Sequence, residues 1–473
     1  MTFQSLEYLI FFTLVFILYW TVGRNNKGRQ NAILILASIV FYGWWDWRFL
    51  GLLLITALST FFAGWLMGKT SDCKKRKLTL IGTIVLNIGI LFLFKYFNFF
   101  VQAFSDAFLL FGRDLGVHSL KIILPVGISF YTFTALSYSI DVYHQKVMPT
   151  HDVLSYFAYV MFFPSLLSGP ISRAQKQLPQ YFSARVFDYG KAISACKLFL
   201  WGGVLKLCMA DRMGIYVDAV YSNIAQHNGT TLFLASVLYS LQIYGDFAGY
   251  SLMAIGSGKL LGIELPVNFV RPYFARTVTE FWRRWHISLT TWFRDYIYFP
   301  MGGNRCSKIR WVFNTMIVFI LSGLWHGAAY TFLLWGSLHG VCMVIERLIY
   351  GEKIKLISDE FSLANCLRLM LTFTIVNFAW IFFRISDVNE VFLVLKKIFT
   401  EPGIPFLDTN ILLLAGIALT IVFSFDFIKE KKLDIHFLSS KYKVIRYLTA
   451  IFLIVYILSF GVLNSSSFIY FQF

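Results

Sequence analysis

The chain has 473 residues, of which 58% are hydrophobic and only 14% are charged. A soluble domain of average composition carries about 25% charged residues, so these values exclude an ordinary soluble protein. The formal net charge of +17 would suit a nucleic-acid-binding protein, but the basic residues collect in short loops between apolar segments. That distribution is the positive-inside pattern of a membrane protein, so we expect lipids and no nucleic acid as partners.

Apolar segments of the length that a bilayer requires, about 20 residues, recur along the whole chain. They predict an all-α polytopic membrane protein with roughly a dozen transmembrane helices. No long linker, low-complexity stretch or clear internal repeat separates them, so residues 1–473 are expected to form a single membrane-embedded domain. The principal segments, in chain order, are residues 6–22, 49–68, 78–94, 122–140, 152–167, 192–210, 231–255, 311–321, 327–345, 366–383, 411–428 and 444–463.

The charges around these segments predict on which side of the membrane each loop lies. No basic residue precedes residues 6–22 and no small-residue cleavage site follows them, which favours a first transmembrane helix over a cleaved signal peptide. Basic residues follow this helix directly, so the N-terminus is expected outside the cell. The basic cluster at residues 429–446 is expected in the cytoplasm. The final apolar segment then leaves residues 464–473 as an extracytoplasmic C-terminal tail of a multi-pass protein in the cell membrane.

One stretch, residues 271–310, is too charged to span the bilayer and too aromatic for a solvated loop. It carries eight basic and two acidic residues. With 3.6 residues per turn, a helix here places Trp282, Trp285 and Leu289 on one face. That face predicts an interfacial or re-entrant helix at the cytoplasmic boundary, with His286 on its covered side. His286 is a candidate active-site residue, although a histidine among tryptophans is also typical of a satisfied core.

A second irregularity lies within residues 311–345, an apolar stretch too long for one transmembrane helix. Small residues surround His326 within residues 322–329, which predicts two helices that meet at a break lining a cavity. Ionisable residues inside membrane segments usually mark a functional site, and a neutral imidazole can take a proton from a hydroxyl and return it. His326 is therefore the strongest candidate catalytic residue; the alternative is a histidine hydrogen-bonded between helices. His339 is expected to be structural or to support the active site from behind, because a continuous helix would turn it away from the face of His326.

Other catalytic and metal-binding patterns are missing from the sequence. The six cysteines form no Cys-x-x-Cys pair, and no His-Glu-x-x-His or similar spacing predicts a metal site. There is neither a Gly-x-Ser-x-Gly elbow nor a Walker A loop, which removes the main support for a serine hydrolase or an ATPase.

Several motifs are similar to those of the bacterial membrane-bound O-acyltransferase (MBOAT) family, in the branch of the alginate O-acetylation membrane protein. The similarity extends over essentially the whole chain. The matching motifs are Phe281-Trp282-Arg283-Arg284-Trp285-His286-Ile287-Ser288-Leu289, Arg294-Asp295-Tyr296, Pro300-Met301-Gly302-Gly303-Asn304-Arg305, Leu324-Trp325-His326-Gly327-Ala328-Ala329, Leu338-His339-Gly340, Pro125-Val126-Gly127-Ile128-Ser129-Phe130 and Ser168-Gly169-Pro170-Ile171.

The resemblance implies a fold, an activity and a set of residues. The family fold is a ring of helices around a thin central region that is pierced by a tunnel. His326 corresponds to the family's catalytic histidine and His286 to its second active-site polar residue. The family takes an acyl group, in this branch usually acetyl, from a cytosolic thioester and delivers it across the membrane. The final acceptor is a sugar hydroxyl on an exported polysaccharide, and a separate extracytoplasmic acetyltransferase often completes the last step.

The expected donor is acetyl-CoA or an acyl carrier protein thioester, with no tightly bound cofactor. Arg283 and Arg284, together with Trp285 and Trp325, are candidate donor-binding residues, because guanidinium groups match the geometry of phosphates. Binding of lipid headgroups is the alternative for any single arginine.

The C-terminal residues Phe468, Tyr470 and Phe473 are similar to the Phe-x-Tyr-x-x-Phe ending of a small membrane peptide that works with another member of the family. The tyrosine of that peptide is proposed to carry the acyl group, so Tyr470 is a candidate acyl relay. An aromatic anchor at the lipid–water boundary is the alternative.

The expected function is O-acetylation of an exported cell-surface polysaccharide. A transporter or flippase for a polysaccharide precursor and a lipid O-acyltransferase remain alternatives. A transporter more often shows inverted repeats, which the sequence lacks. A scaffold role would require that both His286 and His326 tolerate alanine.

Overall fold

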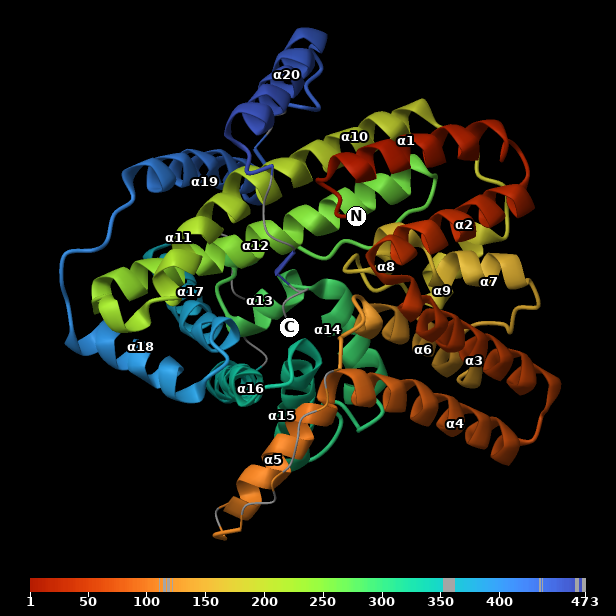
Figure 1. Cartoon of the computed structure of the whole chain (residues 1–473), viewed down its shortest axis with the longest axis horizontal. Helices are drawn as coiled ribbons and strands as arrows, with labels where there is room; N and C mark the ends of the chain where they lie inside the picture. The colour runs from red at the N-terminus through yellow and green to blue at the C-terminus, as the bar shows by residue number, and fades with distance from the viewer. Residues whose placement is uncertain are drawn as a thin grey trace. The chain divides into compact units, whose positions relative to one another are not determined.

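Helices joined by loops make up the described part of the chain, which contains no β-strand (Figure 1). The predicted all-α fold is therefore confirmed. The computed structural model describes residues 1–109, 111–113, 116, 120, 122–351, 362–433, 435, 437–463 and 468–469.

Eight helical stretches among these residues are long and apolar enough to cross a membrane, fewer than the dozen predicted. The predicted segment 152–167 is not one helix, because α7 (Val153–Val160) ends before α8 (Phe163–Leu166) begins with Pro164 in its first turn. Proline has no N–H to donate within a continuous helix. The eight stretches are Lys27–Lys69, Cys73–Leu109, Tyr189–Tyr221, Lys308–His326, Tyr330–Tyr350, Leu363–Arg384, Thr409–Glu430 and Lys443–Phe460.

The chain folds into two compact units, of which the first comprises Met1–Cys196 and Ala254–Pro266. In this unit α3 (Leu50–Lys69), α4 (Cys73–Leu91) and α6 (Ile128–Tyr143) pack side by side (Figure 1). Gly64 of α3 permits that contact, since a Cβ there would lie 2.5 Å from the ring of Tyr138 in α6. Besides α7 and α8, the helices of the unit are α1 (Leu6–Thr21), α2 (Lys27–Asp46), α3 (Leu50–Lys69), α4 (Cys73–Leu91), α5 (Phe97–Leu109), α6 (Ile128–Tyr143) and α9 (Ala174–Gln177).

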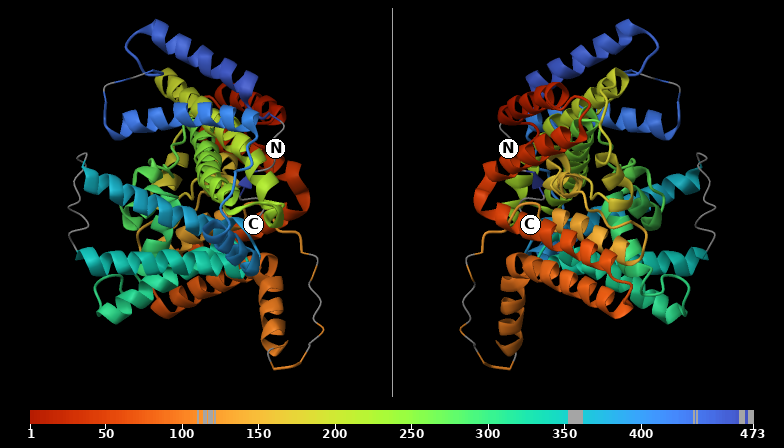
Figure 2. Two further views of the ribbon diagram at one scale, coloured as in Figure 1. Left: turned by 90° about the vertical axis from the view of Figure 1, so that its left-hand side faces the viewer. Right: turned by 90° about the vertical axis from the view of Figure 1, so that its right-hand side faces the viewer.

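The second unit comprises Lys197–Met253 and Val267–Phe473. Helices α10 (Tyr189–Gly203) and α12 (Gly229–Leu260) have residues in both units. Within the second unit, α15 (Lys308–His326) and α16 (Tyr330–Tyr350) pack along each other (Figure 2). The other helices here are α11 (Asp211–Tyr221), α13 (Val278–Arg284), α14 (Ile287–Phe293), α17 (Leu363–Arg384), α18 (Val388–Thr400), α19 (Thr409–Glu430) and α20 (Lys443–Phe460). A single membrane-embedded domain stays a prediction.

Candidate active site

His286 lies at a break between two short helices of the second unit. Helix α13 ends at Arg284 and α14 begins at Ile287, while His286 adopts a left-handed conformation with a φ of 42°. The carbonyl oxygen of Asn268 accepts the Ile287 N–H at 3.0 Å, and its side-chain oxygen accepts the Ser288 N–H at 3.1 Å. The continuous helix predicted here is therefore wrong, because a new helix begins at Ile287 and Asn268 accepts its first two N–H groups. The predicted burial of His286 is confirmed, since the residue is 0% exposed.

His326 is the last residue of α15, and α16 begins four residues later at Tyr330. The predicted break between two helices is confirmed. Gly327 is extended in this break, and a side chain there would overlap the ring of Phe332. His326 is 2% exposed, so protein covers its imidazole.

The two histidines share one aromatic enclosure. The ring centroids of His286 and His326 are 6.2 Å apart. The ring of Trp325 lies 5.7 Å from His286 and 4.9 Å from His326. Phe247 contacts His286 at 4.6 Å, and Trp335 contacts His326 at 5.1 Å. Burial among such rings disfavours an ion, and this favours the neutral imidazole that can accept a hydroxyl proton.

His339 lies outside this pair but is linked to it through Trp335, whose ring is 5.0 Å from that of His339. The indole N–H of Trp282 donates a hydrogen bond to Nδ1 of His339 at 3.3 Å. His339 is 0% exposed, so this bond connects α13 to α16 inside the protein. The role of His339 stays a prediction.

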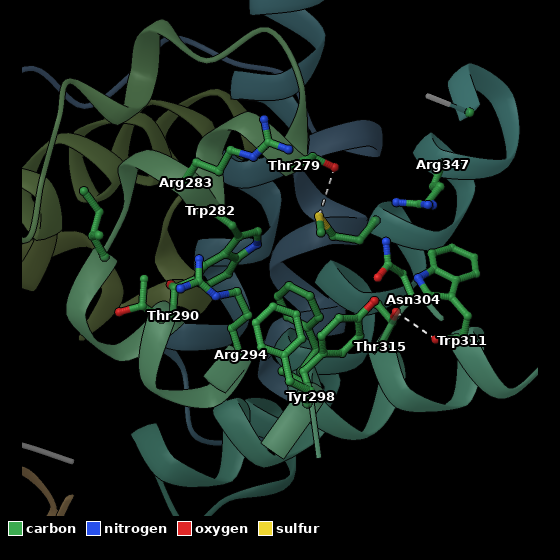
Figure 3. Close-up of a pocket in the computed structure, with 17 residues that line it drawn as sticks. Thr279, Trp282, Arg283, Thr290, Arg294, Tyr298, Asn304, Trp311, Thr315 and Arg347 are labelled. Atoms are coloured by element: carbon green, nitrogen blue, oxygen red, sulfur yellow. Dashed lines mark hydrogen bonds between the residues drawn. The ribbon is translucent and has the colours of Figure 1, made fainter. Parts of the chain in front are cut away.

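A cavity of about 570 Å³ lies among α13, α14, α15 and α16. Three arginines line it, and no acidic residue is among its described lining residues. Arg283 and Arg294 are on one side of the cavity and Arg347 is on the other (Figure 3). Arg294 is paired with Asp295 at 2.7 Å, whereas the guanidinium of Arg347 lies 5.4 Å from the ring centroid of Trp311. The cavity therefore presents positive charge from α13 and α16 to an anionic ligand.

Neither histidine lines this cavity, although the sequence predicted a cavity at His326. Phe319 of α15 does line it, and His326 follows seven residues later on the same helix. That spacing corresponds to about 10 Å along the helix axis. Trp282 lines the cavity, and its ring centroid is 5.6 Å from that of Trp335. The ring of Trp335 in turn lies 5.1 Å from that of His326.

The other predicted donor-binding residues have different environments. Arg284 points to acidic partners, with Glu280 at 2.6 Å and Glu430 at 2.8 Å. Burial raises the pKa of the Glu280 carboxyl, but hydrogen bonds from Arg276 and the charge of Arg284 outweigh burial and hold that pKa below its usual value. Trp285 is fully buried against Trp380, with ring centroids 5.0 Å apart. Of the four, only Arg283 lines the cavity.

Comparison with known proteins identifies the family of the chain. The sequence model of the membrane-bound O-acyltransferase family matches residues 39–383 of the chain, a range that includes both histidine motifs. The chain belongs to the membrane-bound O-acyltransferase family. The resemblance predicted from the motifs is confirmed, and the protein is a multi-pass membrane O-acyltransferase.

This member of the MBOAT family is similar to several named bacterial enzymes. It is 36% identical over 404 residues to the probable alginate O-acetylase AlgI of Pseudomonas aeruginosa, covering 85% of this chain and 75% of that protein. It is 32% identical over 389 residues to the peptidoglycan O-acetyltransferase of Helicobacter pylori, covering 77% and 72% of the two chains. The teichoic acid D-alanyltransferase of Bacillus subtilis is 29% identical over 277 residues, covering 54% of this chain and 68% of that one.

Sequence reasoning missed two features of the second unit. Arg347 lines the cavity only because α16 packs against α15, and its position in the sequence gave no signal. Lys206 and Asp246 are fully buried ionisable residues within apolar segments. Ionisable residues inside membrane segments usually mark function, and this rule singled out His326. The same rule would have found Lys206 and Asp246.

The predicted acyl relay, Tyr470, lies outside the described residues. Its described neighbours in the tail are Phe468 and Ile469, which are 0% and 5% exposed. The ring of Phe468 lies 5.6 Å from that of Phe247, which in turn contacts His286. The described part of the tail is therefore one aromatic ring away from the histidine pair.

Proposed function

We propose that this acyltransferase takes an acetyl group from a cytosolic thioester and transfers it across the membrane for O-acetylation of an exported cell-surface polysaccharide. The observation that carries the proposal is the enclosure of His286 and His326, with ring centroids 6.2 Å apart, inside the region that matches the family. Relatives named for the O-acetylation of alginate and peptidoglycan support acetyl as the acyl group and a polysaccharide as the acceptor.

The cavity lined by arginines is the proposed site for the anionic part of the donor, either coenzyme A or the phosphate-bearing arm of an acyl carrier protein. Arg283 and Arg347 face it from two helices, so a diphosphate or phosphate group would be bound from both sides. The thioester then needs a flexible arm that extends about 10 Å along α15, past Trp282 and Trp335, to His326.

The chemical step needs only a base and a positioned thioester. His326 takes the proton of the acceptor hydroxyl while the hydroxyl oxygen attacks the thioester carbonyl carbon. The tetrahedral intermediate collapses, the carbon–sulfur bond breaks, and the thiolate receives the proton back from the imidazolium. The products are an oxygen ester and a free thiol. His286 helps to orient the reacting groups from the opposite side of the enclosure.

The acceptor side of the reaction is proposed to be extracytoplasmic, together with both chain termini. Tyr470 would take the acetyl group as a phenolic ester and pass it to the polysaccharide, with an extracytoplasmic acetyltransferase completing the transfer. The buried positions of Phe468 and Ile469, close to Phe247, support a tail that reaches the histidine pair.

The proposal is tested with inside-out membrane vesicles that receive acetyl-CoA labelled in its acetyl group. Label is followed in the protein, the lipid and the luminal polysaccharide, against vesicles that lack the protein. We expect label on the protein or on luminal polysaccharide. Label confined to lipid would instead establish a lipid O-acyltransferase. Label that appears only when an acyl carrier protein thioester replaces acetyl-CoA would identify that donor.

A further inference from the structure

Three charged side chains form a buried cluster in the second unit, which we call the Lys206 cluster. Nζ of Lys206 lies 2.7 Å from Oδ1 of Asp211 and 2.7 Å from Oδ1 of Asp246. The side chains are 1%, 6% and 4% exposed. Burying charges is expensive unless they are paired and hydrogen-bonded, so such a cluster inside apolar helices usually has a function.

Close packing of two helical segments brings the cluster together. Lys206 lies in a π-helical turn, Val204–Ala210, that follows α10, and Asp246 lies on α12. A Cβ on Gly249 of α12 would lie 2.7 Å from the carbonyl oxygen of Gly202 and 2.9 Å from the backbone nitrogen of Lys206. Only glycine fits at that contact, which therefore holds the lysine against the Asp246 carboxylate.

The second oxygen of the Asp246 carboxylate is bound by the C-terminal tail. Oδ2 of Asp246 accepts the backbone N–H of Ile469 at 2.8 Å, across 223 residues of sequence. Beside this bond, the ring of Phe468 stacks on that of Tyr250, with centroids 4.5 Å apart. Phe468 also contacts Phe247 at 5.6 Å. Both residues are buried, so this described segment of the tail is a packed part of the unit.

We propose that Asp246, oriented by Lys206, is the docking site of the C-terminal tail and fixes the tail beside the histidine pair. The occupant is this chain's own segment Phe468–Ile469, and Asp246 is a positioning residue. Lys206 occupies Oδ1 of the carboxylate and leaves Oδ2 for the tail. This inference rests on the proposed function in one respect, because it assumes that acyl transfer takes place at the histidine pair.

Asparagine at position 246 should release the tail without changing the shape of the side chain. An asparagine has one acceptor oxygen, which Lys206 would take, and its amino group would then face the N–H of Ile469. Two donors facing each other cannot form a hydrogen bond. Asp218→Asn is the matched control, since Asp218 lies on α11, is paired with Arg384 at 2.8 Å and has a side chain that is 60% exposed.

Hydrogen–deuterium exchange of the full-length protein in detergent measures docking directly. We expect the Ile469 amide to exchange about 10- to 100-fold more slowly in the wild type and in Asp218→Asn than in Asp246→Asn. This factor is the protection that a hydrogen bond to a charged acceptor gives an amide. Phe468→Ala changes only the tail, keeps the N–H donor and should also speed exchange, so the test holds even if Asp246→Asn fails to fold. Exchange in the wild type at the rate of a free peptide with the tail sequence would overturn the proposal, as would unchanged protection in both variants.

Exchange needs no acyl donor, so failure of docking and failure of the proposed function are distinguishable. If the tail is protected but no labelled acetyl group is transferred, docking stands and the proposed function falls. If transfer occurs equally in the wild type and in Asp246→Asn while protection differs, the tail docks at Asp246 but is not needed for transfer.

Discussion

Alanine at Gly336 of α16 should separate α15 from α16, because the backbones of these two helices touch there. A Cβ at position 336 would overlap the carbonyl oxygen of Phe319 and would lie 3.0 Å from its carbonyl carbon and 3.4 Å from Cα of Gly323. Carbon atoms pack at about 3.5–4.0 Å, so the helices must move apart by about 1 Å to accept the methyl group. Contacts between small residues are a principal means of helix packing in membranes.

The expected effect of Gly336→Ala follows from that displacement. Overpacking a tight contact lowers the free energy of unfolding by about 1–3 kcal/mol. His326 is three residues beyond Gly323 on α15, so its imidazole moves with the helix. A misplacement of about 1 Å at a reacting group reduces the rate of reaction about 100-fold. We therefore expect a large loss of acetyl transfer together with a moderate loss of stability.

Two glycines provide matched controls for this experiment. Gly340 lies one turn further along α16, where a Cβ would meet the flexible side chain of Met316, with Sδ at 2.9 Å, so alanine should cost about 1 kcal/mol or less. Gly416 of α19 has nothing within 4 Å of a Cβ, and alanine there should leave stability unchanged or raise it by up to about 1 kcal/mol. Thermal unfolding in detergent and transfer of labelled acetyl are measured for all three variants. Wild-type stability and activity in Gly336→Ala would refute the reasoning.

Three further predictions concern the charged and catalytic groups. Arg283→Ala and Arg347→Ala should each raise the KM for acetyl-CoA about 10- to 100-fold with little change in kcat, and an unchanged KM would remove the cavity as the donor site. His286→Asn should fold like the wild type, because asparagine tolerates the left-handed backbone, but should lower kcat about 100-fold or more; full activity would exclude a role for the imidazole in catalysis. Lys206→Met should lower the free energy of unfolding by about 3–5 kcal/mol, since it leaves buried carboxylates without their ammonium partner, and an unchanged unfolding temperature would contradict this.

Local features of the chain could be predicted from the sequence when the cause was itself local. The break at His326 follows from small residues in the middle of an overlong apolar stretch, and the structure confirms it. The break at His286 could not be predicted, because its cause is the cap provided by Asn268, eighteen residues earlier in the chain. A helical wheel assumes a continuous helix. It therefore predicted correctly which residues are buried, but from a helix geometry that the chain does not adopt.

The error in the number of membrane helices has a local cause, whereas the charged groups come together through contacts between distant segments. Proline at position 164 explains why residues 152–167 form no single helix, and this signal was readable in advance. In contrast, the tail reaches Asp246 across 223 residues, and no spacing rule predicts that pairing. Arg283 and Arg347 likewise come to one cavity through the packing of α16 against both α13 and α15.

The most direct test of the central claim compares the wild type with His326→Ala at matched expression. Inside-out vesicles receive acetyl-CoA labelled in the acetyl group, and the initial rate of label transfer is measured for both proteins. Thermal unfolding of the variant confirms that it is folded. We expect the variant to transfer acetyl groups at least about 100-fold more slowly, the factor typical of a lost general base. Equal rates in the two proteins would contradict catalysis by His326.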